Sequence, residues 1–151
     1  MNINQILSAF LVLFAVIDVL GAIPLIIAIK EKTKIRPGLA TIVTAVILIS
    51  FLFLGESMLR FVGVDIGSFA VAGSILMAII AFEMLLGVQI FKDDDADTAT
   101  ASVVPLAFPL LAGAGTLTTI LSIRAEYETI NIIIAIVLNM IVIFIVLRSV
   151  D

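Results

Sequence analysis

The sequence predicts an all-α membrane protein with five transmembrane helices of an expected six, of which the first and the fourth are broken by Gly and Pro. Three observations predict this class. Of the 151 residues, 63% are hydrophobic and 13% are charged, whereas a soluble domain carries about 25% charged residues. The apolar stretches have the ~20-residue length of spanning helices and lack the alternating pattern of barrel strands. Two of them also contain helix-breaking residues.

The apolar stretches form a single transmembrane domain, residues 1–151. The predicted spans, in chain order, are residues 3–29, 39–54, 68–91, 103–123 and 130–147. A basic loop, residues 30–38, follows the first span, and a tight turn from Arg60 through Gly63 and Asp65 to Gly67 follows the second. An acidic loop begins at Lys92 and leads into the fourth span.

The orientation follows from the basic residues in short loops. The first stretch has no basic region before it and is too long for a signal peptide, so it is predicted to be a retained helix. With the N-terminus outside, the inner side holds six basic residues and the outer side two. The inner set is Lys30, Lys32, Lys34, Arg36, Lys92 and Arg148, and the outer set is Arg60 and Arg124. The sequence therefore predicts a multi-pass protein of the plasma (inner) membrane with its N-terminus outside.

The first break lies in the stretch 14–24, which combines Asp18, Gly21 and Pro24 within an apolar run. A carboxylate at the centre of a bilayer costs roughly 3 kcal/mol or more. Pro24 lacks an N–H and crowds the carbonyl of Leu20, and backbone groups freed inside hydrocarbon need partners. This pattern is typical of a transporter binding site. Two plainer interpretations stay open, namely that Asp18 is only an N-cap for a half-helix beginning at Val19 and that the prolines are only kinks.

A second break, Pro109 to Gly115, matches the first after a shift of 91 residues, and the same shift lays the second span on the fifth. Residues 1–91 would then form a first repeat and residues 102–151 a partial second one. Because each repeat has three spans, the second would be inserted upside down, as a 3+3 inverted repeat. The partner of the third span would fall beyond Asp151, so one helix is expected to be missing. The alternative is that apolar helices with Gly and Pro resemble one another by composition.

Two motifs resemble those of the MarC family of inner-membrane proteins, which includes the SnatA-type neutral amino acid transporters. Residues 18–24 read Asp-Val-Leu-Gly-Ala-Ile-Pro, against the family's usual Asp-Pro-Leu-Gly-Asn-Ile-Pro. Residues 104–115 read Val-Pro-Leu-Ala-Phe-Pro-Leu-Leu-Ala-Gly-Ala-Gly, against Val-Pro-Leu-Ala-x-Pro-x-x-Ala-Gly-Pro-Gly. Val19, Ala22 and Ala114 depart from the pattern. The lost Asn at position 22 puts an amide contact to the substrate in doubt.

The resemblance implies amino acid transport. At each break a new helix N-terminus carries about half a positive charge and free N–H groups, where the carboxylate of an amino acid can bind. Asp18 would face the substrate ammonium or hold a coupling H⁺ or Na⁺. The predicted site for substrate and ion consists of Asp18, Leu20, Gly21, Pro24, Pro109, Gly113, Gly115 and Thr116. No metal and no cofactor are expected.

The predicted function is therefore an ion-gradient-driven secondary transporter for small neutral amino acids. An exporter of other small solutes and a membrane protein without a transport role, such as a structural partner, are the alternatives. An enzyme is not expected, because the chain has neither His nor Cys and shows no phosphate-binding loop. The expected partners are the lipid bilayer and the amino acid, with no nucleic acid, while a homo-oligomer and the role of Glu83 stay open.

Overall fold

The computed structural model describes residues 2–32, 35–86 and 111–150, and within these ranges every regular element is a helix. The helices, in chain order, are α1 (Ile3–Ile17), α2 (Ile23–Lys32), α3 (Pro37–Val62), α4 (Ile66–Leu86), α6 (Ala114–Arg124) and α7 (Thr129–Val150). The all-helical prediction is confirmed for this part of the chain. The number of spans and the repeat stay predictions.

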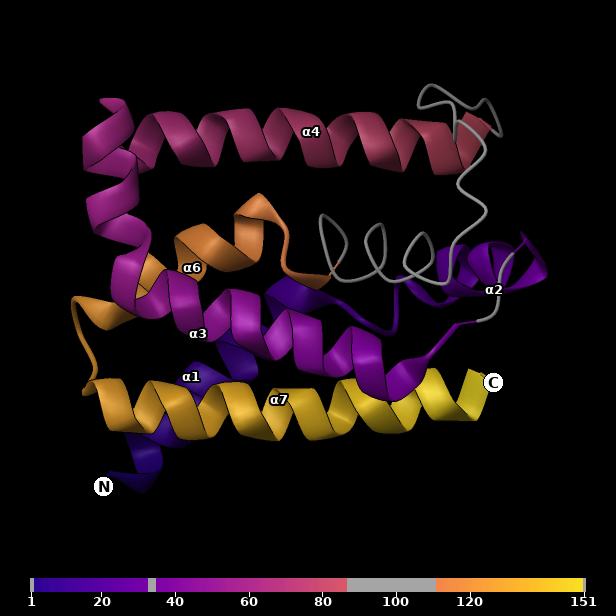
Figure 1. The fold of residues 1–151 in the computed structure, drawn as a ribbon, viewed down its shortest axis with the longest axis horizontal. Coiled ribbons are helices and arrows are strands. Elements are labelled where there is room, and N and C mark those ends of the chain that lie inside the picture. The colour runs from indigo at the N-terminus through magenta and orange to yellow at the C-terminus, as the bar shows by residue number, and fades with distance from the viewer. Residues whose placement is uncertain (1, 33–34, 87–110, 151) are drawn as a thin grey trace.

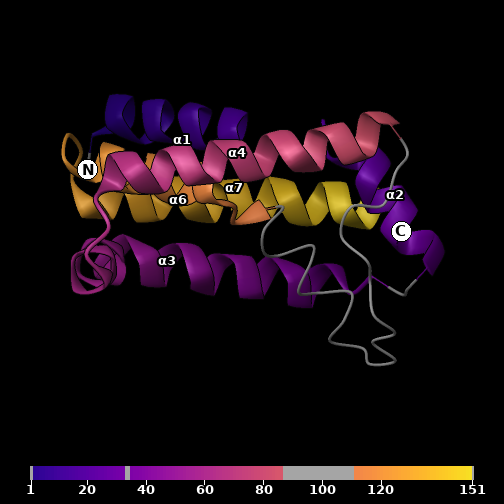
Figure 2. The ribbon, with the colours of Figure 1, turned by 90° about the horizontal axis from the view of Figure 1, so that it is seen from above.

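The long helices run along a common axis, with the connections gathered at its two ends (Figures 1 and 2). The N-terminus, the α3–α4 connection and the α6–α7 connection lie at one end, which we call the N-terminal end. Helix α2 and the last turn of α7 lie at the other, where the Lys30 Nζ donates to the Val150 carbonyl at 2.6 Å. Arg60 and Arg124 therefore lie apart from Lys30 and Arg148, as the orientation prediction requires. Which end faces the cytoplasm stays a prediction.

The core forms where α7 packs against α1 and α3. Helix α1 contributes Ala9, Leu13 and Ile17, spaced four residues apart on one face, as expected of a helix with one packed side. On α3 and α7, the faces turned away from the core leave large apolar side chains uncovered, for example Ile42 and Ile145. Helices α3 and α7 are both long and apolar enough to cross a bilayer, judged by length and composition.

Two buried asparagines join α7 to α1, and the sequence analysis did not single them out. The Asn139 side chain, 1% exposed, donates from Nδ2 to the Phe10 carbonyl at 3.2 Å. Nearer the N-terminal end, Asn131 is fully buried and donates to the Gln5 Oε1 at 2.6 Å. A polar group in an apolar interior is costly unless it is hydrogen-bonded. The signal was present in the sequence as two amides inside an apolar span.

The boundary predicted after the second span is wrong, because α3 continues to Val62 and Arg60 is helical. Arg60 pairs there with Glu56, one helical turn earlier. The helix ends at Gly63, whose φ of 78° lies in the left-handed region. The Gly63 N–H donates to the Arg60 carbonyl and the next N–H to the Leu59 carbonyl, which together form a Schellman motif.

In Figure 1 the C-terminal turns of α3 leave the common axis at the N-terminal end and lead to the start of α4, and Figure 2 shows these turns end-on. The Arg124 guanidinium, from the last turn of α6, donates to the carbonyls of Leu52 and Phe53 in α3. The Phe51 ring lies 2.6 Å from where a Cβ on Gly55 would be, so any other residue there would require the ring to shift. Sharp bends in helices form where glycine or an inserted polar group disturbs the helical ladder.

Candidate functional site

The first break is formed by Asp18, which ends α1 and caps the turn that follows. Its backbone is left-handed, with φ 45° and ψ 48°, and its N–H donates to the Phe14 carbonyl at 3.1 Å. The carboxylate Oδ1 accepts the N–H of Gly21 at 3.1 Å, and the Asp18 carbonyl accepts the N–H of Ala22 at 3.0 Å. An aspartate tolerates the left-handed region better than most residues do. Asp18 is thus the C-cap of α1, and its side chain closes the turn that follows. The interpretation of Asp18 as the N-cap of a half-helix beginning at Val19 is wrong, because α2 begins only at Ile23.

Gly21 and Pro24 hold different positions in this break. A Cβ on Gly21 would lie 2.3 Å from the Asp18 Oδ2, so the cap depends on glycine at this position. Pro24 is the second residue of α2, where a missing N–H removes no helical hydrogen bond. The Leu20 carbonyl accepts the N–H of Ile23 at 3.2 Å. The proline therefore follows the break, and Asp18 with Gly21 forms it.

The second break ends at Gly113, which is the N-cap of α6 and is buried. Its carbonyl accepts the first helical hydrogen bond, from the Leu117 N–H at 3.0 Å, and it has no side chain with which to cap the first amides. Thr116 is fully buried, and its hydroxyl donates back to the Leu111 carbonyl at 3.2 Å. Pro109 and the first half of the predicted fourth span lie outside the described residues.

The other threonine hydroxyls of α6 are also engaged by the backbone. Those of Thr118 and Thr119 donate to the Gly115 carbonyl at 3.0 and 2.8 Å. The hydroxyl protons of these two threonines are thus given to a carbonyl about one turn back, a common arrangement in helices.

The two breaks lie close together. A Cβ on Gly115 would meet the Val16 Cγ1 at 3.6 Å, so the first turn of α6 packs against α1 two residues before Asp18. Helix α1, with 15 residues, reaches about 22 Å from the N-terminal end, and α6, with 11, about 16 Å. Both values fall inside a hydrocarbon core of about 30 Å. Of the predicted residues, Leu20 is 52% exposed and Asp18 and Gly21 are also exposed, whereas Gly113 and Thr116 are buried.

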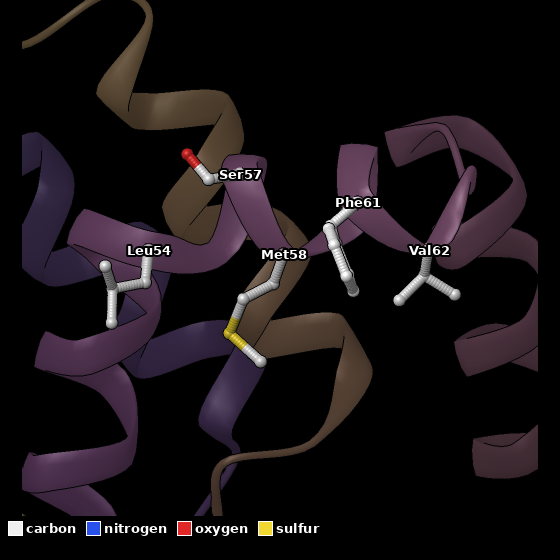
Figure 3. Close-up of a pocket in the computed structure, with 5 residues that line it drawn as sticks. All are labelled: Leu54, Ser57, Met58, Phe61 and Val62. Atoms are coloured by element: carbon white, nitrogen blue, oxygen red, sulfur yellow. The ribbon is translucent and has the colours of Figure 1, made fainter.

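Two shallow hollows in the described part of the chain lie away from the breaks. One is a shallow groove of about 280 Å³ along the end of α3 (Figure 3), lined by Leu54, Ser57, Met58, Phe61 and Val62. The other lies at the α3–α4 corner beside Arg60 and Asp65. Among the described residues no group of three or more carboxylates could hold a metal ion. Glu83 lies on α4, and its side chain is outside what the structure describes.

The sequence profile of the MarC family integral membrane proteins matches residues 3–151. The chain belongs to the MarC family. It is 30% identical to the UPF0056 membrane protein MJ1677 of Methanocaldococcus jannaschii, over 100% of this chain and 81% of that relative. It is 34% identical to the UPF0056 membrane protein YhcE of Escherichia coli, over 81% of this chain and 62% of the relative.

A UPF0056 membrane protein of Aquifex aeolicus is 31% identical, over 82% of this chain and 64% of the relative. The chain thus spans less than two thirds of the Escherichia coli and Aquifex relatives. These names describe membrane proteins and name no reaction. No solved structure matches the chain. The comparisons establish an integral membrane protein of the MarC family.

Proposed function

We propose that this protein is a secondary transporter for small neutral amino acids, driven by an ion gradient, with its substrate site between the two helix breaks. The observation that supports the proposal is the packing of Gly115 against Val16, because it brings the start of α6 next to the end of α1, where the first break lies. Interrupted helices that meet near the midplane are the usual architecture of substrate sites in secondary transporters.

The chemistry of the breaks suits a zwitterion. The start of α6 supplies backbone amides and the positive end of a helix dipole, which attract a carboxylate. The first break supplies the Asp18 carboxylate, which has acceptor capacity beyond its hydrogen bond to Gly21 and suits an ammonium group or a coupling H⁺ or Na⁺. Binding of these two groups needs no ion pair to the side chain of the substrate, which favours a neutral amino acid.

A structural membrane protein without transport is the second candidate, and one observation favours it. The Asp18 carboxylate is used in capping, and the shallow hollows described above lie away from the breaks. An exporter of other small solutes would use the same broken helices with a different occupant.

Flux of labelled glycine and alanine into vesicles containing the purified protein tests the proposal. We expect uptake that depends on a proton or sodium gradient and that unlabelled neutral amino acids compete away. Asp18→Asn keeps a capping oxygen while removing the charge, so it should abolish the ion dependence without unfolding the protein. Absence of flux under both gradients, from protein that is folded by circular dichroism, would favour the structural role.

A further inference from the structure

Helix α3 is longer than a bilayer crossing requires. Its 26 residues extend about 39 Å at 1.5 Å per residue, whereas the hydrocarbon core is about 30 Å thick. The sequence analysis expected the span to end at Leu54, and just before this residue Arg124 donates to the carbonyls of Leu52 and Phe53. The last turns of α3 leave the common axis (Figure 1). The part of α3 that exceeds the thickness of the hydrocarbon core therefore does not continue along the bundle axis. We call residues 54–62 the α3 arm.

The α3 arm has one apolar side that the described protein does not cover. Leu54 and Met58 are each 56% exposed, Val62 is 72% exposed, and Phe61 is 94% exposed. In Figure 3 these four side chains point to the same side of the arm, while the Ser57 hydroxyl points to the other. They line the shallow groove described above.

The remaining sides of the α3 arm carry different chemistry. Gly55 and Leu59 are buried against the protein. Glu56 and Arg60 form an exposed ion pair, with side chains 46% and 79% exposed. Charged groups are costly within hydrocarbon, so this pair fixes the arm at the level of the membrane surface. A helix that has charges on one side and large apolar side chains on another lies flat in the interface.

Lipid fits the apolar side better than a second copy of the chain does. The spanning part of the same helix also carries uncovered apolar side chains, with Ile42 62% and Val46 58% exposed, and in an integral membrane protein such side chains contact lipid. Four side chains on one short arm also fall far short of the roughly 20–30 residues per partner in a stable protein interface.

We propose that the α3 arm is an in-plane interfacial segment, with Leu54, Met58, Phe61 and Val62 inserted at the boundary between lipid headgroups and acyl chains. The arm would fix the depth of the N-terminal end in the bilayer. Through Arg124 it would also fix the level of α6, whose other end forms the second break.

The absence of Trp from the chain makes single-tryptophan fluorescence a direct test. Phe61→Trp is reconstituted in phosphatidylcholine vesicles whose acyl chains carry bromine either near the glycerol or near the terminal methyl. Val46→Trp, on the spanning part of α3, is the deep control. Glu126→Trp, in the exposed α6–α7 connection at the same end, is the aqueous control, and Met58→Trp is a second reporter on the arm.

We expect tryptophan at position 61 to lose most of its emission to the shallow bromines and little to the deep ones or to aqueous iodide. Position 46 should respond to the deep bromines, and position 126 to iodide. Deep quenching at positions 61 and 58 would mean that the arm spans the bilayer, and iodide quenching that it lies in water. Protection from every quencher would mean that protein covers it. Each of these three results would overturn the proposal.

Discussion

The two breaks in this bundle end and restart a helix in different ways. At the first, the Asp18 side chain accepts the Gly21 N–H and its carbonyl accepts the Ala22 N–H. At the second, Gly113 starts α6 without a side chain, in a buried position. The first break is closed by a carboxylate, whereas the N-cap of α6 makes no side-chain hydrogen bond to the first helical amides. A helix N-terminus carries a partial positive charge, so the two breaks differ in the sign of the charge that each contributes.

The comparison also separates structural residues from candidate binding residues. A methyl group on Gly21 would collide with the Asp18 carboxylate, whereas one on Gly115 would meet Val16 at ordinary contact distance. Glycine is thus required sterically at the first break and is tolerant of alanine at the second. Substitutions at the first break should therefore lower mainly stability, and substitutions at the second should lower mainly transport.

Asp18→Ala should give the largest loss of stability. The substitution removes the cap and leaves a non-Gly residue without polar side-chain support at φ 45°, which together cost about 2 kcal/mol. Asp18→Asn keeps a capping oxygen and tolerates the left-handed region, so its stability should stay near that of the wild type. The measurement is the unfolding midpoint in detergent. Equal midpoints for Ala, Asn and Asp would contradict the capping role.

Gly21→Ala should destabilise by about 1 kcal/mol, because the Asp18 carboxylate must rotate away and the cap is lost. Gly38→Ala is the control, since the atom nearest to its Cβ is a Phe144 ring carbon at 3.9 Å. If the collision with Asp18 is the cause, the double variant with Asp18→Ala should lose no more than Asp18→Ala alone. Full additivity in this cycle would contradict that explanation.

The sequence predicted the helical class and the first break because both depend on local composition. The limits of α3 were missed because hydropathy falls at Glu56 and Arg60, although the helix continues until Gly63 permits a left-handed end. Charged residues end an apolar span without ending a helix.

The contact between Arg124 and the Leu52 carbonyl could not be predicted, because it joins residues far apart in the chain. The sequence could predict that Asn139 has a hydrogen-bond partner, since an amide in an apolar span needs one. It could not predict that the partner is the Phe10 carbonyl. At the site, the sequence placed Asp18 and Gly115 in two breaks expected to share one site, but it did not indicate the contact between Gly115 and Val16. Helices α2 and α6 begin 91 residues apart, at Ile23 and Ala114, which matches the shift proposed for the repeat.

Gly115→Ala should leave stability nearly unchanged, or raise it by up to about 1 kcal/mol, because alanine favours a helix and its methyl fits. Transport should fall, because the added methyl fills the space between position 115 and Val16. We expect the two breaks to move relative to each other at this contact during transport. Labelled glycine flux is compared with that of the wild type at matched protein content. Unchanged flux would remove Gly115 from the proposed site and leave it as a packing residue.

The smallest effect is expected at Asp65, which caps α4 with the same spacing as Asp18 but in an exposed connection. Its carboxylate accepts both the hydroxyl and the N–H of Ser68, and these hydrogen bonds hold the pKa of Asp65 below its usual value. Because the folded pKa is the lower one, this contribution to stability is complete above the unfolded pKa and is lost as the pH falls through the folded one. Asp65→Asn should remove that acid-side dependence from the unfolding midpoint. If the unfolding midpoint of Asp65→Asn still fell at acid pH as in the wild type, the cap would carry no pH-dependent stability. A charged cap in water would then be no stronger than an amide cap such as that of Asp18→Asn.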